Sequence, residues 1–402
     1  MRIKIITYGC AYNKSDSAII KKLLEKKGHK IVKNKAELII VNTCTVKKPT
    51  ENKIIKKLEE LKEKKVLVTG CLVEVKKKNL KKRFPQHLFA ELDELESIPD
   101  IINNEPSQKK KSNRARLEQE ENEIIKIIPI ADGCLGNCAY CITKKARGHL
   151  HSFPIEDIVK QVSSKEVWLT AQDMSTYGLD IGTNLAKLLK KIKGNSKIRV
   201  GMMNSKHVLK ILPELIDAYK SNSIFKFLHL PVQSGSDKVL KEMNRGYTTK
   251  SFEKIIMEFR KTFPKITIAT DIITGFPTET ENDFKKTIEL VQKIRPDVIN
   301  ISMYCAMEGT QASELKQLPN IIRKERSRKI TKLFQQISLE NNKKWVGWKG
   351  EILIDEKNKN GMIGRNYAYK QVIINNGTIG ETVMVKIVEA KTHCLIGEII
   401  NE

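Results

Sequence analysis

The stretch Cys134-Leu-Gly-Asn-Cys138-Ala-Tyr-Cys141 comes shortly after the apolar run 124–130, which is typical of a β-strand. Three thiolates spaced C-x3-C-x2-C on a loop can bind one soft metal centre. A structural zinc ion takes four protein ligands, and His149 is the nearest candidate for the fourth. An iron–sulfur cube usually takes four cysteines, so three leave one iron open for a small molecule. The spacing favours this open cluster over zinc, and zinc over a purely structural role.

Tyr140 precedes the last of these cysteines, and with it the spacing resembles the signature of the radical S-adenosylmethionine (SAM) enzymes. The resemblance implies that Cys134, Cys138 and Cys141 hold a [4Fe-4S] cluster whose open iron binds the amino and carboxylate groups of SAM. In that family, reduction of the cluster splits the sulfonium to a 5′-deoxyadenosyl radical. We therefore expect a SAM-dependent radical enzyme.

The chain is basic: its 402 residues include 73 Lys or Arg and 47 Asp or Glu, for a formal charge of +26. This length predicts two or three domains. The charge fits either a solvated lysine-rich surface or a polyanionic partner such as RNA. No stretch approaches the roughly 20 apolar residues of a membrane span, and the first residues lack the apolar segment of a signal peptide. We expect a cytoplasmic protein with reduced cysteines.

Residues 1–105 have the pattern of a small α/β domain with a parallel sheet. The predicted strands are 3–6, 37–41 and 65–68, and the predicted helices are 50–63 and 15–26, the latter with Ser15 or Asp16 as N-cap. A cysteine follows each strand, at Cys10, Cys44 and Cys71. Because parallel strands end at one edge of a sheet, we expect these cysteines to converge on a second cluster with an open iron. The alternative is that each is a small buried residue.

Three segments around these cysteines resemble the N-terminal motifs of the methylthiotransferases, radical SAM enzymes that replace a C–H bond with C–S–CH3. They are Thr7–Ser17, Asn42–Val46 and Thr69–Cys71. The resemblance implies that Cys10, Cys44 and Cys71 hold an auxiliary [4Fe-4S] cluster that carries the sulfur. It also implies two molecules of SAM, one to methylate that sulfur and one to supply the radical that abstracts hydrogen from the substrate carbon.

Residues 106–120 are polar and lack apolar periodicity, which indicates a linker between domains, although their five basic residues also suit phosphate. Residues 121–340 then alternate strands and helices, as in the partial (β/α)6 barrel of radical SAM enzymes. The predicted strands are 124–131, 166–170, 198–203, 225–231, 266–273 and 298–303, and the predicted helices are 155–162, 184–192, 207–219, 251–263 and 282–294.

The predicted barrel strands end in polar residues, at the mouth where barrel sites lie. The resemblance places SAM contacts there: the amino group after the second strand, the ribose and methionine parts at the third and fourth, and adenine after the fifth. The residues implicated are Tyr140, Gln172, Asp173, Asn204 and Gln233. For each of the strand-end residues the alternative is a loop cap or a turn. We interpret His229, within an apolar strand, as a satisfied core histidine.

Two loops depart from the family pattern. Tyr304-Cys-Ala-Met-Glu-Gly-Thr310 occupies the place where the family usually has Tyr-x-Arg-Pro-Gly-Thr, and Ser205-Lys-His207 replaces a loop that usually contains proline. Because the arginine and proline are missing, no role is carried over from the family to the first loop. Cys305 is interpreted as an unpaired thiol near the barrel mouth.

Residues 341–402 change from long helices to short glycine-punctuated strands, predicted at 351–354, 370–374, 382–388 and 395–400. This pattern predicts a small antiparallel β-barrel. It resembles a TRAM domain, the RNA-binding barrel that ends many methylthiotransferases. Cationic and aromatic side chains alternate in the segment 364–370, a combination that meets phosphates and stacks bases, and the alternative is a solvated strand. The RNA contacts proposed are Arg365, Tyr367, Tyr369 and Lys370.

The expected fold is therefore α/β, with a parallel N-terminal domain (1–105), a linker (106–120), a radical SAM barrel (121–340) and a TRAM barrel (341–402). The motifs most resemble the archaeal and eukaryotic branch that makes the 2-methylthio derivative of N6-threonylcarbamoyladenosine in tRNA. Its carboxylate should meet cations, for which Lys144, Lys145 and Arg147 are candidates and a solvated basic turn is the alternative.

Three other functions stay open on the sequence: action on isopentenyladenosine, action on a ribosomal protein, and a non-catalytic, metal-stabilised RNA-binding protein. The expected partners are tRNA, an electron donor and a sulfur source.

Overall fold

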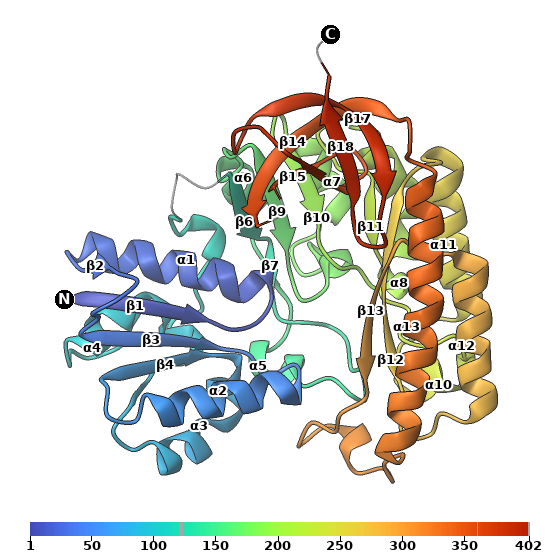
Figure 1. Ribbon diagram of the computed structural model, residues 1–402. Coiled ribbons are helices and arrows are strands. Elements are labelled where there is room, and N and C mark those ends of the chain that lie inside the picture. Colours follow the sequence, from blue (N-terminus) through green and yellow to red (C-terminus); the bar gives the residue numbers. More distant parts are fainter. Residues whose placement is uncertain (120–123, 360, 401–402) are drawn as a thin grey trace.

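The computed structural model describes residues 1–119, 124–359 and 361–400 in three packed units (Figure 1). The predicted boundary between linker and barrel, at residues 120 and 121, lies outside this range. Within it, no helix is long and apolar enough to cross a membrane.

The N-terminal unit is a parallel sheet flanked by helices. Its strands run in the order β2-β1-β3-β4-β5, so the three predicted strands lie next to one another. The strands are β1 (Arg2–Thr7), β2 (Lys30–Ile31), β3 (Leu38–Thr43), β4 (Val66–Gly70) and β5 (Leu88–Phe89), and the helices are α1 (Ala11–Lys26), α2 (Lys48–Glu60), α3 (Cys71–Arg83) and α4 (Ile98–Ile102).

Two details of this unit differ from expectation. Helix α1 starts at Ala11 with Cys10 as its N-cap, while Ser15 and Asp16 are buried inside it. The prediction that either caps the helix is wrong, because both polar side chains contact other parts of the protein instead. Helix α3 was not predicted, because only its first turn and Leu80 are buried and the rest is lysine-rich.

The central unit has six parallel strands in two adjoining sheets, β6-β9-β10 and β11-β12-β13. A bridge between Ile198 and Ile224 joins them, which leaves β6 and β13 as the two edges of a partial barrel. The strands are β6 (Ile125–Pro129), β9 (Glu166–Thr170), β10 (Lys197–Val200), β11 (Phe227–His229), β12 (Thr267–Thr274) and β13 (Val298–Met303). This is the predicted strand order of a partial (β/α)6 barrel.

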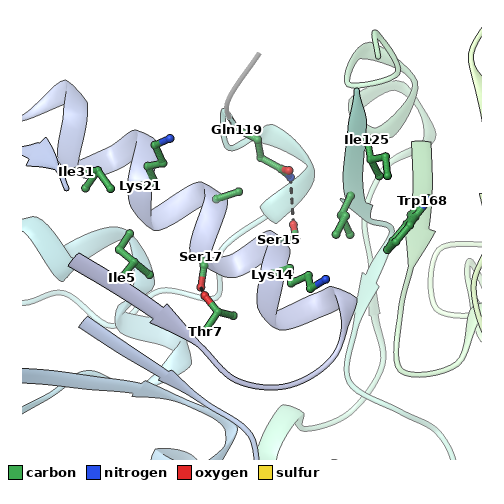
Figure 2. A pocket seen from close by; sticks show the side chains of 12 residues that line it. Ile5, Thr7, Lys14, Ser15, Ser17, Lys21, Ile31, Gln119, Ile125 and Trp168 are labelled. Atoms are coloured by element: carbon green, nitrogen blue, oxygen red, sulfur yellow. Dashed lines mark hydrogen bonds between the residues drawn. The ribbon is translucent and has the colours of Figure 1, made fainter. Parts of the chain in front are cut away.

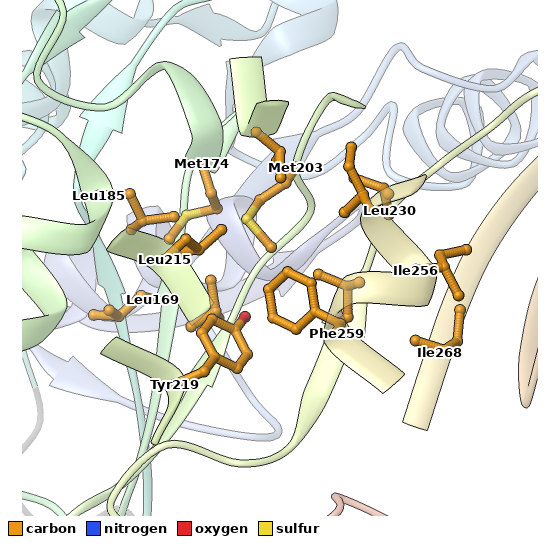
Figure 3. Packing of buried hydrophobic residues seen from close by; sticks show 14 of the residues in the cluster. Leu169, Met174, Leu185, Met203, Leu215, Tyr219, Leu230, Ile256, Phe259 and Ile268 are labelled. Atoms are coloured by element: carbon orange, nitrogen blue, oxygen red, sulfur yellow. The ribbon is translucent and has the colours of Figure 1, made fainter. Parts of the chain in front are cut away.

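Helices cover the outer face of these strands: α6 (Ile155–Lys160), α7 (Leu185–Lys191), α9 (Leu212–Tyr219), α11 (Thr249–Thr262), α12 (Glu281–Ile294) and α13 (Asn320–Lys343). Leu169 of β9, Ile268 of β12 and Phe259 of α11 belong to the main core between the two layers (Figure 3). The predicted helix 207–219 is divided into α8 (Ser205–Val208), a 3-10 turn and α9, because Pro213 can begin a helix but not continue one.

The C-terminal unit is a closed barrel in the order β14-β15-β16-β18-β17. Its strands are β14 (Lys349–Asn358), β15 (Gly361–Arg365), β16 (Gln371–Ile374), β17 (Thr382–Ala390) and β18 (Leu395–Ile399). The barrel is not purely antiparallel as predicted, because β16 pairs with β18 in parallel. Helix α13, which the sequence pattern also failed to show, leads into it along the side of the central unit (Figure 1).

Candidate active site

The structure brings the three N-terminal cysteines to one edge of the first sheet. Cys10 follows β1, Cys44 follows β3 and Cys71 follows β4, and these strands are neighbours in parallel register. A Cβ on Gly9 would lie 2.9 Å from the Cβ of Cys44, so the loop of Cys10 touches the loop of Cys44. The three thiols are also close enough to influence one another electrostatically.

The surroundings of these thiols suit a thiophilic metal centre. Burial is the main cause that raises the pKa of Cys44 to about 11, and burial also raises the pKa of Cys71, so without a metal both are neutral. Metal binding displaces such protons, because the thiolate is the ligand. A donor set of sulfur alone favours iron–sulfur or zinc over hard cations.

The second cysteine loop follows the short strand β7 (Ala131–Asp132) and wraps around its own sulfur atoms. A Cβ on Gly136 would lie 3.2 Å from the Sγ of Cys134 and 3.8 Å from that of Cys138. Each sulfur accepts a hydrogen bond: from the N–H of Gly136 to Cys134 (3.2 Å), from the N–H of Thr143 to Cys141 (3.4 Å) and from Nη1 of Arg245 to Cys138 (3.2 Å). Such donors stabilise thiolates, so the loop fits an iron–sulfur cluster.

Arg245 is a site residue that the sequence analysis missed. It is 8% exposed and lies behind the cluster loop, where Nη1 also reaches the hydroxyl of Tyr140 (3.4 Å) and Nη2 donates to the carbonyl of Pro231 (3.2 Å). No local pattern marks this arginine, since it stands in a turn after α10 (Asp237–Glu242), far from the motif. Tyr140 itself packs against a small apolar cluster that includes Phe276 and Tyr304.

The residues expected to contact SAM lie at the barrel mouth, and several also stabilise their own loops. Asp173 is buried and its Oδ1 accepts hydrogen bonds from Ser175 and from the N–H of Asn204. The side chain of Asn204 accepts from the N–H of Lys206 as the cap of α8. The capping alternative therefore holds for these two, and a SAM contact for either stays a prediction.

Gln172 and Gln233 also stay predicted SAM contacts. Oε1 of Gln172 is buried and has no hydrogen-bond partner among the described residues. Gln233 has a φ of +72°, in the left-handed region, where side chains are strained. Its backbone pairs with Asp271 and Ile273 of β12, which fixes the strained loop at the mouth.

The inner face of the barrel carries a polar group that the sequence analysis noticed only in part. Nε2 of His229 lies 3.0 Å from Oδ1 of Asp271, which also accepts from Nδ2 of Asn300 at 2.7 Å. Burial opposes ionisation of Asp271, but these two bonds hold its pKa below the usual value. His229 is thus a satisfied histidine, although it faces the barrel interior rather than the apolar core.

The three predicted substrate cations differ in accessibility. Lys144 is partly buried on α5 (Thr143–Arg147), and Nζ of Lys145 donates to the carbonyl of Gly309 in the loop 304–310. Arg147 is 7% exposed and pairs with Asp16 and Asp132. The prediction that Arg147 meets the substrate is therefore corrected, because its guanidinium is occupied inside the protein.

The predicted RNA segment is corrected in the same way. Arg365 pairs with Asp355, Tyr369 packs against Phe225 and Phe227 at the base of the central barrel, and Nζ of Lys370 binds Asp297 (2.7 Å) and Asn342. Tyr369 and Lys370 thus attach the C-terminal barrel to the central unit, whereas the ion pair of Arg365 lies within the C-terminal barrel, and all three residues are mostly buried. Tyr367 is 41% exposed, beside Trp345 and Trp348, and stays a candidate RNA contact.

A cleft of about 490 Å³ lies between α1 and the first barrel strands (Figure 2). Lys14 and Ser15 line one wall from α1, and Ile125 and Trp168 line the other from β6 and β9. Gln119 bridges to Ser15 by a hydrogen bond of 3.1 Å (Figure 2). The cleft opens beside the edge strand β6, between the N-terminal and central units.

Three family models match successive parts of this architecture. Residues 2–90 match the uncharacterized protein family UPF0004, residues 128–291 match the radical SAM superfamily and residues 343–400 match the TRAM domain. A radical SAM methyltransferase from Kitasatospora setae has a similar fold, with a TM-score of 0.57 and 11% identity over 78% of this chain and 76% of its own. The chain is a radical SAM enzyme, the class that uses SAM and a [4Fe-4S] cluster.

Relatives of known name match over the full length of the chain. The "Probable threonylcarbamoyladenosine tRNA methylthiotransferase" of Pyrococcus horikoshii is 42% identical, with 100% of both chains covered. The "Threonylcarbamoyladenosine tRNA methylthiotransferase" of Homo sapiens is 34% identical over 100% of this chain and 74% of its own. The chain belongs to the threonylcarbamoyladenosine tRNA methylthiotransferase family.

Replacing Gly70 by Ala should disturb the N-terminal cysteine site. Gly70 has a φ of +95°, and a Cβ there would lie 2.5 Å from Oδ1 of Asn42 and from the carbonyl of Thr43, so the backbone beside Cys44 or Cys71 must shift. Gly28→Ala is the matched control, since its φ of +81° brings similar strain but its Cβ meets nothing within 4 Å. We expect Gly70→Ala to lose about 1–3 kcal/mol more stability than the control and to bind less iron on anaerobic reconstitution. Equal melting temperatures and iron contents would contradict this.

Proposed function

We propose that this enzyme converts N6-threonylcarbamoyladenosine, 3′ to the tRNA anticodon, to its 2-methylthio derivative. The observation that carries the proposal is the presence of two three-cysteine sites close to each other. Helix α5 follows the loop of Cys141, and its last residue, Arg147, donates a hydrogen bond to Cys71. The full-length identity of 34–42% to the named relatives supports the choice of base. Of the predicted cations, Lys144 is the one we propose for the carboxylate of the substrate.

Each cysteine site holds one [4Fe-4S] cluster in this proposal. Cys134, Cys138 and Cys141 bind the cluster that supplies radical chemistry with SAM, and Cys10, Cys44 and Cys71 bind the one that supplies sulfur. The SAM contacts proposed at the mouth are those of Tyr140, Gln172, Asp173, Asn204 and Gln233. The remaining task of the chain is to orient SAM and the base in one cavity and to exclude water from the radical.

An electron donor and a sulfur source complete the reaction. Reduction of the SAM-binding cluster needs an external reductant, and the sulfur inserted into each product must be replaced. Reduced cysteine ligands fit the cytoplasm.

The exposed side of the C-terminal barrel supports tRNA binding. Trp345, Trp348 and Tyr367 form an aromatic group with ring centroids 5.5–6.1 Å apart, of which Tyr367 is exposed. Lys349 and Lys386 are exposed and directly opposite each other on β14 and β17. Like charges in that position repel each other, and a bound phosphate would relieve the repulsion.

Removal of one or the other set of cysteines should separate reductive cleavage of SAM from methylthio transfer. Replacing Cys134, Cys138 and Cys141 by Ala should abolish reductive cleavage of SAM. Replacing Cys10, Cys44 and Cys71 should leave cleavage intact but stop methylthio transfer, because only the sulfur site is lost. Both are measured as 5′-deoxyadenosine and modified nucleoside by mass spectrometry. Catalytic methylthiolation by the N-terminal triple variant would refute the two-cluster proposal.

Tyr367→Ala should weaken tRNA binding by about 1–3 kcal/mol if a base stacks on this ring. The dependence of affinity on salt should stay the same, because no charge is removed. Lys349→Ala is the comparison. It should reduce the slope of the logarithm of the binding constant against the logarithm of the salt concentration by about 0.7–0.9. Unchanged affinity in both variants would place the RNA surface elsewhere.

The substrate is tested with two tRNAs that differ at one base. One carries N6-threonylcarbamoyladenosine and the other isopentenyladenosine, and each is given to the reduced enzyme with SAM and sulfide. We expect the 2-methylthio product from the first alone, because Lys144 suits a carboxylate. Product only from the second tRNA, or only from a ribosomal protein, would establish one of the alternative substrates. No SAM cleavage at all would favour a non-catalytic RNA-binding protein.

A further inference from the structure

Arg147 lies between the two cysteine sites and contacts one of them directly. It is the last residue of α5, six residues after Cys141, and its side chain is 2% exposed. Its Nε donates a hydrogen bond to the Sγ of Cys71 at 3.3 Å. Helix α5 therefore connects the SAM-cluster loop to a sulfur atom of the N-terminal site, and it lies between the two units in Figure 1.

A buried group of two arginines and two aspartates holds Arg147 in place. Asp16 accepts from Nη2 of Arg147 and from Nε of Arg114, at 2.7 and 2.8 Å. Asp132 pairs with Nη1 of both arginines, at 3.6 Å from Arg147. The ring of Tyr12 lies 4.4 Å from the guanidinium of Arg147 and 5.9 Å from that of Arg114. Two positive charges thus balance two negative ones.

The two arginines differ in their remaining contact. Arg114 donates from Nη2 to the backbone carbonyl of Leu92 at 3.2 Å. Arg147 donates to the sulfur of Cys71 instead. Nη1 of Arg147 is buried and, at 3.6 Å from Asp132, has an ion pair but no hydrogen-bond partner among the described residues. Of the two arginines, only Arg147 therefore presents its charge and a hydrogen-bond donor to the sulfur of Cys71.

We propose that Arg147 is a positioning residue that holds Cys71 and raises the reduction potential of the auxiliary cluster. The inference rests on the proposed function, in which Cys10, Cys44 and Cys71 bind that cluster. Reduction adds negative charge to a cluster, and hydrogen bonds to its sulfur atoms together with a nearby cation stabilise that charge. Arg245 makes the same kind of contact with Cys138 at the other site, at 3.2 Å.

The test uses the full chain in which Cys134, Cys138 and Cys141 are replaced by Ala, so that only the N-terminal site can bind iron. Arg147→Met and Arg147→Lys are compared with Arg114→Met and Arg114→Lys after anaerobic reconstitution. Removing either arginine leaves two buried carboxylates with one cation, which makes Arg114 a matched control. Iron and sulfide content and the potential of the cluster, titrated by electron paramagnetic resonance, are measured for each protein.

We expect the potential to move to more negative values in Arg147→Met, to move less in Arg147→Lys, and to change little in the Arg114 variants. If Arg147→Met does not retain iron, the shift is judged on Arg147→Lys. A potential equal to that of the parent, or an equal shift from both arginines, would overturn the role of Arg147 but leave the two-cluster proposal intact. A parent that binds no iron would overturn both.

Discussion

The N-terminal cysteine site depends on one constraint, that neighbouring parallel strands end at the same edge of their sheet. In the N-terminal sheet Thr7 pairs with Asn42, and Thr43 pairs with Gly70, so the next loops begin side by side. A slip of one residue in this register would turn every side chain of a strand to its opposite face. The left-handed conformation of Gly70 then redirects the chain so that Cys71 begins a helix at this edge.

The N-terminal and central units are joined by buried ion pairs rather than by one continuous apolar core. The N-terminal and central cores form separate clusters, and between them lie the ion pairs of Asp16 and Asp132. Buried ion pairs of this kind contribute little net stability, yet each partner is costly to leave unpaired. The arrangement therefore favours one relative placement of the two units over others.

Features that depend on short segments could be predicted from the sequence. Strands β9 and β13 match their predicted bounds, and the three N-terminal cysteines lie at one sheet edge as expected, because strand periodicity and cysteine position are both local properties. Helix α13 was missed because its buried residues are few among many charges. The partners of Arg147, Arg365 and Lys370 come from other strands, helices or loops, so periodicity within one segment could not show that these cations are buried. Arg245 was missed for the same reason.

Helix α13 has a consequence for how RNA meets the enzyme. Its 24 residues span about 36 Å along the central unit, and the C-terminal barrel begins directly beyond it. Tyr369 and Lys370 lock that barrel against the base of the central strands. In the proposed function, RNA binds the outer side of this barrel, so it must span the length of the helix to reach the mouth of the central barrel. The proposed RNA surface and the barrel mouth thus stand at a fixed separation, and a nucleotide can reach the mouth only if it lies that far along the bound RNA.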